Sequence, residues 1–186
     1  MSPGEWTSTS MPYLTPREQG EPDAWSAELE ARGQRGSQRV VHAGEVPAPS
    51  GIAELLGLSV AATVVVRRRV IYLADEPCEL TDTYYPVDIA RGTRLASTAK
   101  IRGGAVTLLA ELGYAAALVR EDVVARMPTE DEREVLGTAE GEPLLQLTRV
   151  TFDHEDRPIQ VDRMAMPAHR QQLRYEIRVG DDSAQS

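Results

Sequence analysis

The stretch Arg67–Pro86, which reads RRRVIYLADEPCELTDTYYP, decides the fold. It begins inside a longer run, Ala62 to Leu73, whose Val, Ile and Thr residues are typical of a strand. Ala74–Pro77 then supplies the acidic residues and the proline that favour a tight turn. Beyond the turn, every second side chain lies on one face of an outgoing strand: Thr81, Thr83 and Tyr85. The stretch therefore predicts a β-hairpin.

A second unit of the same form lies near the C-terminus. Leu144–Phe152 predicts a strand, Asp153–Pro158 an acidic turn that ends in proline, and Ile159–Met166 an outgoing strand. We expect the two hairpins to form one antiparallel sheet, with the polar residues of their outgoing strands converging on a pocket.

The remaining pattern adds short strands and helices. Ser50 is expected to cap a helix over Gly51–Leu56, and Thr129 with Glu132 has the spacing of a capping box. The other expected elements are strands at 39–46, 115–127 and 173–179 and helices at 103–112 and 129–136. The predicted class is α+β, with a mostly antiparallel sheet and a few helices.

The domain organisation follows from composition. Residues 1–38 are rich in Ser, Thr, Pro and Gly and are expected to be a flexible segment with a helical turn at 24–31. Residues 39–180 form the predicted domain, and 181–186 a polar tail. Two interpretations stay open for Trp6 and Trp25: at least one is partly exposed or packs loosely on the domain, or Trp25 anchors the segment to the sheet or to a second subunit.

The bulk composition excludes several classes of protein. A net charge of −9 argues against a chain that binds nucleic acid by itself. The single cysteine, Cys78, excludes an intrachain disulfide and fits a reducing compartment. No run of about 18 apolar residues and no apolar leader occurs, so a cytoplasmic protein without a membrane span is expected.

Catalytic and metal motifs are missing from the sequence. The histidines are His42, His154 and His169, and no pair of them has ligand spacing. There is no Gly-x-Ser-x-Gly elbow and no phosphate loop. No catalytic residue, metal or cofactor is therefore expected, and Cys78 is interpreted as a packing residue.

The series of motifs resembles the UTRA domain, the effector-binding domain of HutC-type regulators in the GntR family. The resemblance spans about residues 53–179. The matching features are the arginine-rich strand before LADEP (73–77), YYP (84–86), KIRGG (100–104), GEPLL (141–145) with Arg149, RPI (157–159) and RYEI (174–177). The resemblance implies a chorismate-lyase-like fold that binds a small-molecule effector and controls DNA binding through a homodimer.

The first hairpin and the glycine pair supply part of the predicted site. Arg67 and Arg69 share one face of their strand, and Arg68 shares the other with Tyr72, so only one set faces a pocket. We assign Arg68 and Tyr72 to the pocket; the alternative for the arginines is a solvated sheet edge. The expected helix start adds Arg102, Gly103 and Gly104, because free backbone N–H groups there attract an anion. The alternative is that the two glycines only allow a tight turn.

The second hairpin completes the site. Gln160 and Asp162 share a face with Met164 and Met166. The resemblance places Gln160 where sugar-binding members carry a glutamate, and Met166 where they carry a tyrosine. A more apolar or differently shaped ligand is expected. The predicted ligand-binding residues are Arg68, Tyr72, Thr81, Thr83, Tyr85, Arg102, Gly103, Gly104, Gln160, Asp162 and Met166.

Three functions follow from these features. The leading one is effector sensing for a GntR/HutC-type regulator, with DNA bound only through a winged-helix domain that this sequence does not contain. The second is a chorismate-lyase-like enzyme, with Arg68, Arg102 and Asp162 in the convergent polar roles. The third is a stand-alone module that dimerises with a full-length regulator.

Overall fold

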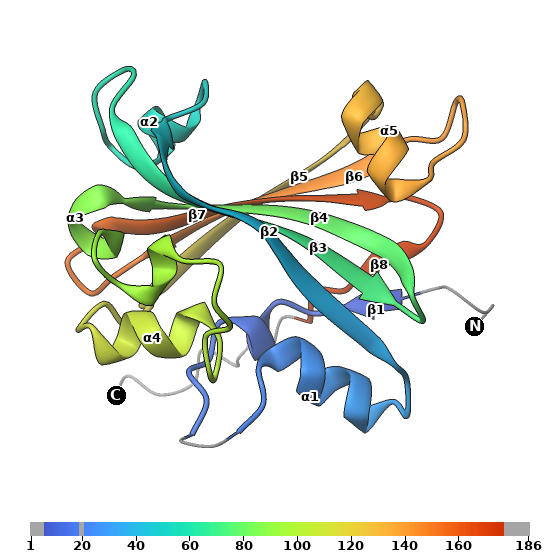
Figure 1. Ribbon diagram of the computed structural model, residues 1–186, viewed down its shortest axis with the longest axis horizontal. Coiled ribbons are helices and arrows are strands. Elements are labelled where there is room, and N and C mark those ends of the chain that lie inside the picture. The colour runs from blue at the N-terminus through green and yellow to red at the C-terminus, as the bar shows by residue number, and fades with distance from the viewer. Residues whose placement is uncertain (1–5, 19–20, 177–186) are drawn as a thin grey trace, which may run out of the picture.

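A six-stranded antiparallel sheet is the centre of the computed structural model, which describes residues 6–18 and 21–176 (Figure 1). Its spatial order is β2-β3-β4-β7-β6-β5. The strands are β2 (Gly36–Pro47), β3 (Thr63–Leu73), β4 (Glu76–Pro86), β5 (Leu118–Arg126), β6 (Leu144–Phe152) and β7 (Pro158–Pro167). A second, parallel pair joins β1 (Trp6–Ser8) to β8 (Gln171–Leu173).

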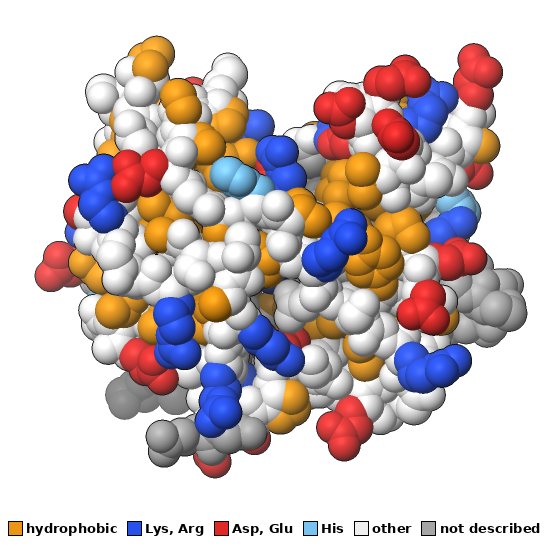
Figure 2. All heavy atoms as spheres, in the orientation of Figure 1, with side chains coloured by type: hydrophobic (Ala, Val, Ile, Leu, Met, Phe, Trp, Pro, Cys, Tyr) orange, Lys and Arg blue, Asp and Glu red, His pale blue; other side chains and the backbone are white. Residues whose placement is uncertain are grey.

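Helices lie against both faces of the sheet. They are α1 (Ala24–Ala31), α2 (Ile52–Leu55), α3 (Val87–Ala90), α4 (Ala105–Glu111) and α5 (Glu130–Leu136), with 3₁₀ turns η1 (Met11–Tyr13) and η2 (Arg94–Ala96). In Figure 1, α1, α4 and the β1–β8 pair lie under one face, called here the inner face. The helices α2 and α5 stand at the two ends of the outer face, and Figure 2 shows the molecule hollowed between them. The α+β class is thereby confirmed.

The two predicted hairpins form as expected and join directly. In the first, a two-residue loop connects β3 to β4, and Ala74 and Asp75 both have positive φ (49° and 70°), as a type I′ turn requires. The turn is shorter than predicted, since Glu76 and Pro77 already belong to β4. The hairpins meet where β4 pairs with β7, from Leu80 opposite Ala165 to Tyr84 opposite Val161.

Several smaller expectations are confirmed or corrected. The capping box of α5 is present, with the Thr129 side chain and the Glu132 side chain each bonded to the other residue's backbone N–H. Gly51, not Ser50, caps α2, because a residue with φ of 78° starts that helix. The last strand of the described residues is β8, which ends at Leu173, where the predicted strand 173–179 begins. Residues 174–176 are not in a strand, and residues 177–179 are outside the described range.

The N-terminal segment packs on the inner side of the sheet. Trp6 and Trp25 are both buried, with ring centroids 4.8 Å apart, and they cluster with Leu29, Ile71 and Cys78. The interpretation that Trp25 anchors this segment to the sheet is therefore confirmed, and the one in which a tryptophan is exposed is wrong. The boundaries at 38 and 180 stay predictions.

Candidate ligand-binding site

A cavity of about 610 Å³ lies between the inner face of the sheet and the segments beneath it. Its floor comes from β3, β4, β6 and β7. Its other walls come from residues 6–26, the start of β2, the loop that leads into α4, and β8. This volume falls in the range of about 300–1,000 Å³ that small-molecule sites occupy.

One polar row crosses the inner face of the sheet over five strands and runs through the floor of the cavity. Backbone register places its members side by side, in the order Arg67, Thr83, Asp162, Arg149 and Glu121. Each comes from a different strand, so alternation along each strand sends all five side chains to the inner face. The row is buried and carries both signs of charge.

Asp162 sits at the centre of this row. It is 4% exposed and accepts hydrogen bonds from Thr83 Oγ1 at 2.6 Å and from Gln160 Nε2 at 2.6 Å. Both donors are neutral. Its carboxylate is therefore held in place by hydrogen bonds rather than by an ion pair.

Arg149 and Glu121 form the ion pair of the row. Arg149 Nε lies 2.6 Å from Glu121 Oε1, and both side chains are nearly buried. Ser10 of the N-terminal segment donates to the other Glu121 oxygen at 2.9 Å. Burial acts to raise the pKa of Glu121, but Arg149 and these hydrogen bonds outweigh it and hold the pKa below its ordinary value.

Two further charged residues, Glu79 and Arg69, lie next along the floor. Thr81 Oγ1 donates to Glu79, and Arg69 Nη2 donates to Thr83 Oγ1 at 3.1 Å. Enclosure in the cavity removes Glu79 from bulk water and raises the pKa of its carboxyl, although part of its surface still faces the cavity. A cationic partner at close range would therefore stabilise the ionised form of Glu79.

The Arg67 side chain stabilises one wall of the cavity by hydrogen bonds to the backbone. Its guanidinium donates to the carbonyl oxygens of Arg94 at 3.1 Å, of Ser97, and of Ala99 at 3.3 Å. Burial lowers its pKa. These bonds fix the loop that leads from η2 to α4, which forms one side of the cavity.

Apolar side chains line the far end of the cavity. Trp6, Trp25 and Tyr13 come from the N-terminal segment, and Ile71 and Cys78 from the first hairpin. Burial raises the pKa of the Cys78 thiol to about 12, so the thiolate is scarce at neutral pH and the side chain acts as an apolar one.

Buried polar atoms without a protein partner concentrate on this cavity. Five of the eight such atoms among the described residues belong to its lining: Arg17 Nε, Trp25 Nε1, Arg69 Nε, Gln160 Oε1 and Gln171 Oε1. Buried polar groups are normally hydrogen-bonded, so this concentration indicates a surface made to contact something polar.

Six of the predicted site residues line the cavity, namely Tyr85, Gly103, Gly104, Gln160, Asp162 and Met166. Thr81 and Thr83 lie beneath its surface, 1% exposed each, and their hydroxyls already donate to carboxylates. They position the floor instead of facing a ligand. Whether any of the predicted residues contacts a ligand stays a prediction.

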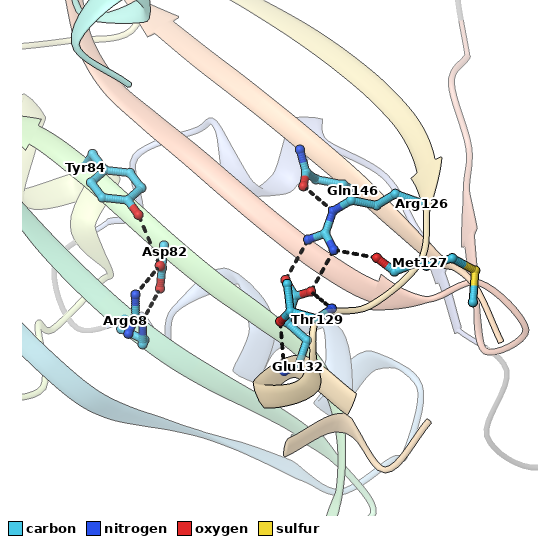
Figure 3. A network of polar contacts seen from close by, with 8 residues as sticks. All are labelled: Arg68, Asp82, Tyr84, Arg126, Met127, Thr129, Glu132 and Gln146. Carbon is cyan, nitrogen blue, oxygen red and sulfur yellow. Dashed lines mark hydrogen bonds and ion pairs between the residues drawn. The ribbon is translucent and has the colours of Figure 1, made fainter. Parts of the chain in front are cut away.

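The other three predicted residues lie outside the cavity lining. Arg68 is on the outer face, where it makes a bidentate pair with Asp82 at 2.7–2.8 Å, and Tyr84 donates to the same carboxylate (Figure 3). The register of β3 with β4 shifts between Ile71 and Tyr72, and Tyr72 does not line the cavity. Arg102 is exposed at the turn before α4.

The glycine pair is required by backbone shape. Gly103 and Gly104 have φ of 74° and 88°, a region that side chains disfavour. A Cβ on Gly103 would also meet Thr107 Oγ1 at 3.0 Å. Thr107 donates to the Gly103 carbonyl at 2.8 Å and accepts from the Arg17 amide at 2.9 Å, so this turn also holds the N-terminal segment.

Sequence reasoning missed several residues of the cavity. Arg69, Glu79 and Arg149 contribute charges to its floor and Arg17 and Arg39 to its other walls, and the lining from residues 6–17 and 23–26 was not foreseen. The period-two pattern placed Arg67 and Arg69 on one face of their strand and so could have identified Arg69. The opposite face, with Arg68 and Tyr72, was assigned to the pocket instead.

Two further surveys cover only the residues that the structure describes. No group of three or more His, Cys, Asp or Glu side chains is placed to hold a metal ion. No helix among them is long and apolar enough to cross a membrane.

Comparison with known proteins was made at the level of family, sequence and structure. The family model described as the UTRA domain matches residues 31–172. An uncharacterised HTH-type transcriptional regulator of Streptomyces coelicolor is 29% identical over 123 residues, 64% of this chain and 46% of the relative. An HTH-type transcriptional regulator of Mycobacterium tuberculosis is 27% identical over 135 residues, 72% of this chain and 48% of the relative. The chain thus spans about half the length of these relatives.

Solved structures share the fold. The effector domain of PhnF from Mycobacterium smegmatis has a TM-score of 0.71 at 21% identity, covering 83% of this chain and 94% of that one. The ligand-binding domain of a GntR-family regulator from Bordetella bronchiseptica has a TM-score of 0.65 at 27% identity, covering 89% and 96%. These likenesses confirm the fold that the sequence resemblance implied.

Proposed function

The chain belongs to the UTRA domain family, and we propose that it is the effector-sensing domain of a GntR-type transcription regulator of the HutC subfamily. A small metabolite binds in the inner cavity, and the bound and free forms differ in how they place an attached DNA-binding head. The observation that carries this proposal is the enclosed cavity of about 610 Å³, whose wall gathers five of the eight unpartnered buried polar atoms.

The cavity suits binding better than catalysis. Cys78 is held as a thiol, since burial raises its pKa to about 12. The carboxylate of Asp162 is already engaged by two donors, and Arg67 by three carbonyls. Groups that are held in place by such hydrogen bonds give the cavity a preformed shape, which favours recognition. Incubation with chorismate is the check, and formation of 4-hydroxybenzoate would revive the lyase alternative.

The regulator is proposed to act in the cytoplasm as a homodimer. Dimerisation lets a ligand-linked change in one domain alter the spacing between two heads. Light scattering coupled to size-exclusion chromatography of the 186-residue chain should give twice the monomer mass; a monomer at all accessible concentrations would remove this part of the proposal.

A thermal-shift screen with two matched variants tests the sensing function. A ligand that binds only the folded state raises the melting temperature. At a concentration of 100 times its Kd it adds about 2.7 kcal/mol to the free energy of unfolding. Candidates are sugar phosphates, amino acids and aromatic metabolites. A true cavity ligand should stabilise the wild type and the outer-face variant Arg68→Ala, but not Asp162→Ala. Hits that survive in Asp162→Ala and vanish in Arg68→Ala would contradict the site.

A further inference from the structure

From the charges inside the cavity, we infer that the effector is a zwitterion, with an anionic group, a cationic group and a flat apolar substituent. This inference rests on the proposed sensing function and narrows it to a chemical class. It comes from how Arg69, Glu79, Asp162 and Arg149 are placed on the floor, whereas the cations Arg17, Arg39 and Lys100 lie on the other walls of the cavity.

The floor keeps opposite charges close but largely unpaired. Arg149 contacts Glu121 through Nε. Among the described residues, Arg69 has no carboxylate within 4.0 Å, and neither Glu79 nor Asp162 has a cationic group within that distance. Their hydrogen bonds go to neutral groups, namely Thr83, Thr81 and Gln160. A desolvated charge of either sign is unfavourable until it acquires a partner.

A ligand that carries charge of only one sign does not supply a counter-charge to both the arginines and the carboxylates of the floor. An anion would pair with Arg69 but would also approach Glu79 and Asp162, which would repel it. A cation would pair with the carboxylates and be repelled by Arg69 and Arg149. A neutral polyol can donate and accept hydrogen bonds but leaves every charge without a counter-charge. A ligand that carries both signs satisfies both sets at once, because the attraction between unlike charges and the repulsion between like charges are both stronger in a low dielectric than in water.

The pKa of Glu79 agrees with this assignment. Enclosure raises the pKa of its carboxyl by more than the charges of Arg69 and Arg149 lower it, because neither arginine lies within ion-pair distance. An ammonium group delivered by the ligand supplies a cation at close range.

The apolar end of the cavity defines the third part of the ligand. Trp6, Trp25 and Tyr13 line this end and pack in one cluster with Ile71. Trp25 Nε1 is buried without a protein partner and is able to donate to an acceptor on the ligand. Aromatic walls favour flat substituents, which stack on them. An amino acid or short peptide with an aromatic side chain fits this description.

Four compounds with one indole ring but different charges test the inference. L-tryptophan is the zwitterion, N-acetyl-L-tryptophan the anion, L-tryptophan amide the cation, and N-acetyl-L-tryptophan amide the neutral form. Glycyl-L-tryptophan extends the zwitterion to a second length. Calorimetric titration into the 186-residue chain should give the lowest Kd for a zwitterion, with each single cap weakening binding about tenfold or more.

Two cavity variants locate the two charged subsites. In Glu79→Gln the effect of N-acetylation should shrink to about threefold or less, while the effect of amidation persists; Arg69→Gln should do the reverse. Arg68→Gln, on the outer face, should change neither. Each variant should keep its cooperative melting transition, which separates loss of a subsite from loss of the fold.

The outcomes that overturn the inference are distinct from failure of the sensing function. If glucose 6-phosphate or another ligand of a single charge binds more tightly than every zwitterion, and Asp162→Ala abolishes that binding, the zwitterion class is wrong and the sensing function stands. If Glu79→Gln and Arg69→Gln leave the charge preference unchanged, the subsite assignment is wrong. If neither these compounds nor any candidate in the metabolite screen binds, both proposals fall.

Discussion

At the scale of single residues, the threonines at positions 81 and 83 explain how a charged floor is kept rigid. Both lie on β4 in the middle of the sheet, and both are fully buried. Their hydroxyls donate to Glu79 and Asp162 and so fix two carboxylates without adding charge. Short side chains at these positions also leave room above them for the longer side chain of Arg69, which reaches Thr83.

Replacing Thr83 with valine should therefore weaken the fold measurably. Thr83→Val keeps the volume but removes the donor to Asp162 and the acceptor for Arg69, leaving buried charged groups less satisfied. We expect a loss of about 1–3 kcal/mol in the free energy of unfolding, measured by urea titration. Thr148→Val, on the outer face of β6, is the matched control and should change stability by less than about 0.5 kcal/mol. Equal effects of the two variants would argue against the role given to Thr83.

The Glu121–Arg149 pair should make stability depend on pH. Because the folded-state pKa of Glu121 is lowered, its contribution is present above the unfolded pKa of about 4.3 and is lost as the pH falls through the folded pKa. Glu121→Gln should destabilise the protein by about 3 kcal/mol at pH 7, since it leaves Arg149 buried without its counter-charge. The difference between wild type and variant should shrink toward pH 3.

Denaturant titrations at pH 7, 5 and 3 measure this difference. The double variant Glu121→Gln with Arg149→Met is the control, and it should recover much of the lost stability at pH 7 because no buried charge is left unpaired. A destabilisation by Glu121→Gln that is the same at all three pH values would contradict the pair's role.

At the scale of secondary structure, local patterns identified most elements. The two hairpins and α5 follow from turn and capping chemistry, which acts within a few residues. The first residue of α2 was misplaced because Gly51 at positive φ, and not the Ser50 side chain, begins that helix. This helix start depends on the backbone conformation of Gly51, which the presence of a serine before it does not predict.

Which face of β3 meets the cavity could not be decided from alternation. The alternation separates Arg67 and Arg69 from Arg68, but it does not show which of the two faces of the strand meets the cavity. Both faces of β3 are covered over part of their length, since Val65 packs into one core cluster and Val64 into another. The choice depends on long-range packing, which here places Arg68 against Asp82 on the outer face.

The cover of the cavity was also beyond local reasoning. Residues 6–31 carry no strong periodicity, and α1 is short. Their position depends on two tryptophans that pack with Ile71, Leu73 and Cys78, which are far away in the sequence. A segment rich in Ser and Pro therefore forms part of a buried site once its few large apolar side chains find partners.

Trp25 of α1 should couple stability to ligand binding. Trp25→Ala removes both a buried anchor and part of the cavity wall, so we expect a loss of about 3–5 kcal/mol in stability and a marked rise in the Kd of any ligand found by the screen. Leu29→Ala is the matched control, because Leu29 lies in the same cluster but does not line the cavity. It should lower stability by about 2–5 kcal/mol.

The two variants are compared at a temperature where both remain folded, judged by circular dichroism. Ligand binding should fall in Trp25→Ala and stay within about threefold of wild type in Leu29→Ala. If both variants lose binding equally, the segment acts through general stability and not as a wall of the site.

At the scale of the whole molecule, acidic side chains outnumber basic ones. The chain has 20 Lys and Arg against 29 Asp and Glu. Five arginines among the described residues line the cavity, and exposed ones such as Arg68 and Arg91 form pairs with carboxylates. A polyanion therefore meets an acidic surface on which some of the arginines are already paired.

For this reason the 186-residue chain should not bind operator DNA by itself. Phosphate contacts need free Lys and Arg side chains, and association with an acidic surface is disfavoured further by repulsion. We expect no retardation of promoter fragments in a gel-shift assay at about 150 mM salt, with any apparent Kd weaker than about 100 µM. Repeating the assay at about 50 mM salt, where nonspecific contacts strengthen, separates weak electrostatic binding from recognition. Sequence-specific retardation at submicromolar protein that persists at the higher salt would show that DNA is contacted by this chain directly, and the effector would then act on the same polypeptide that reads the operator.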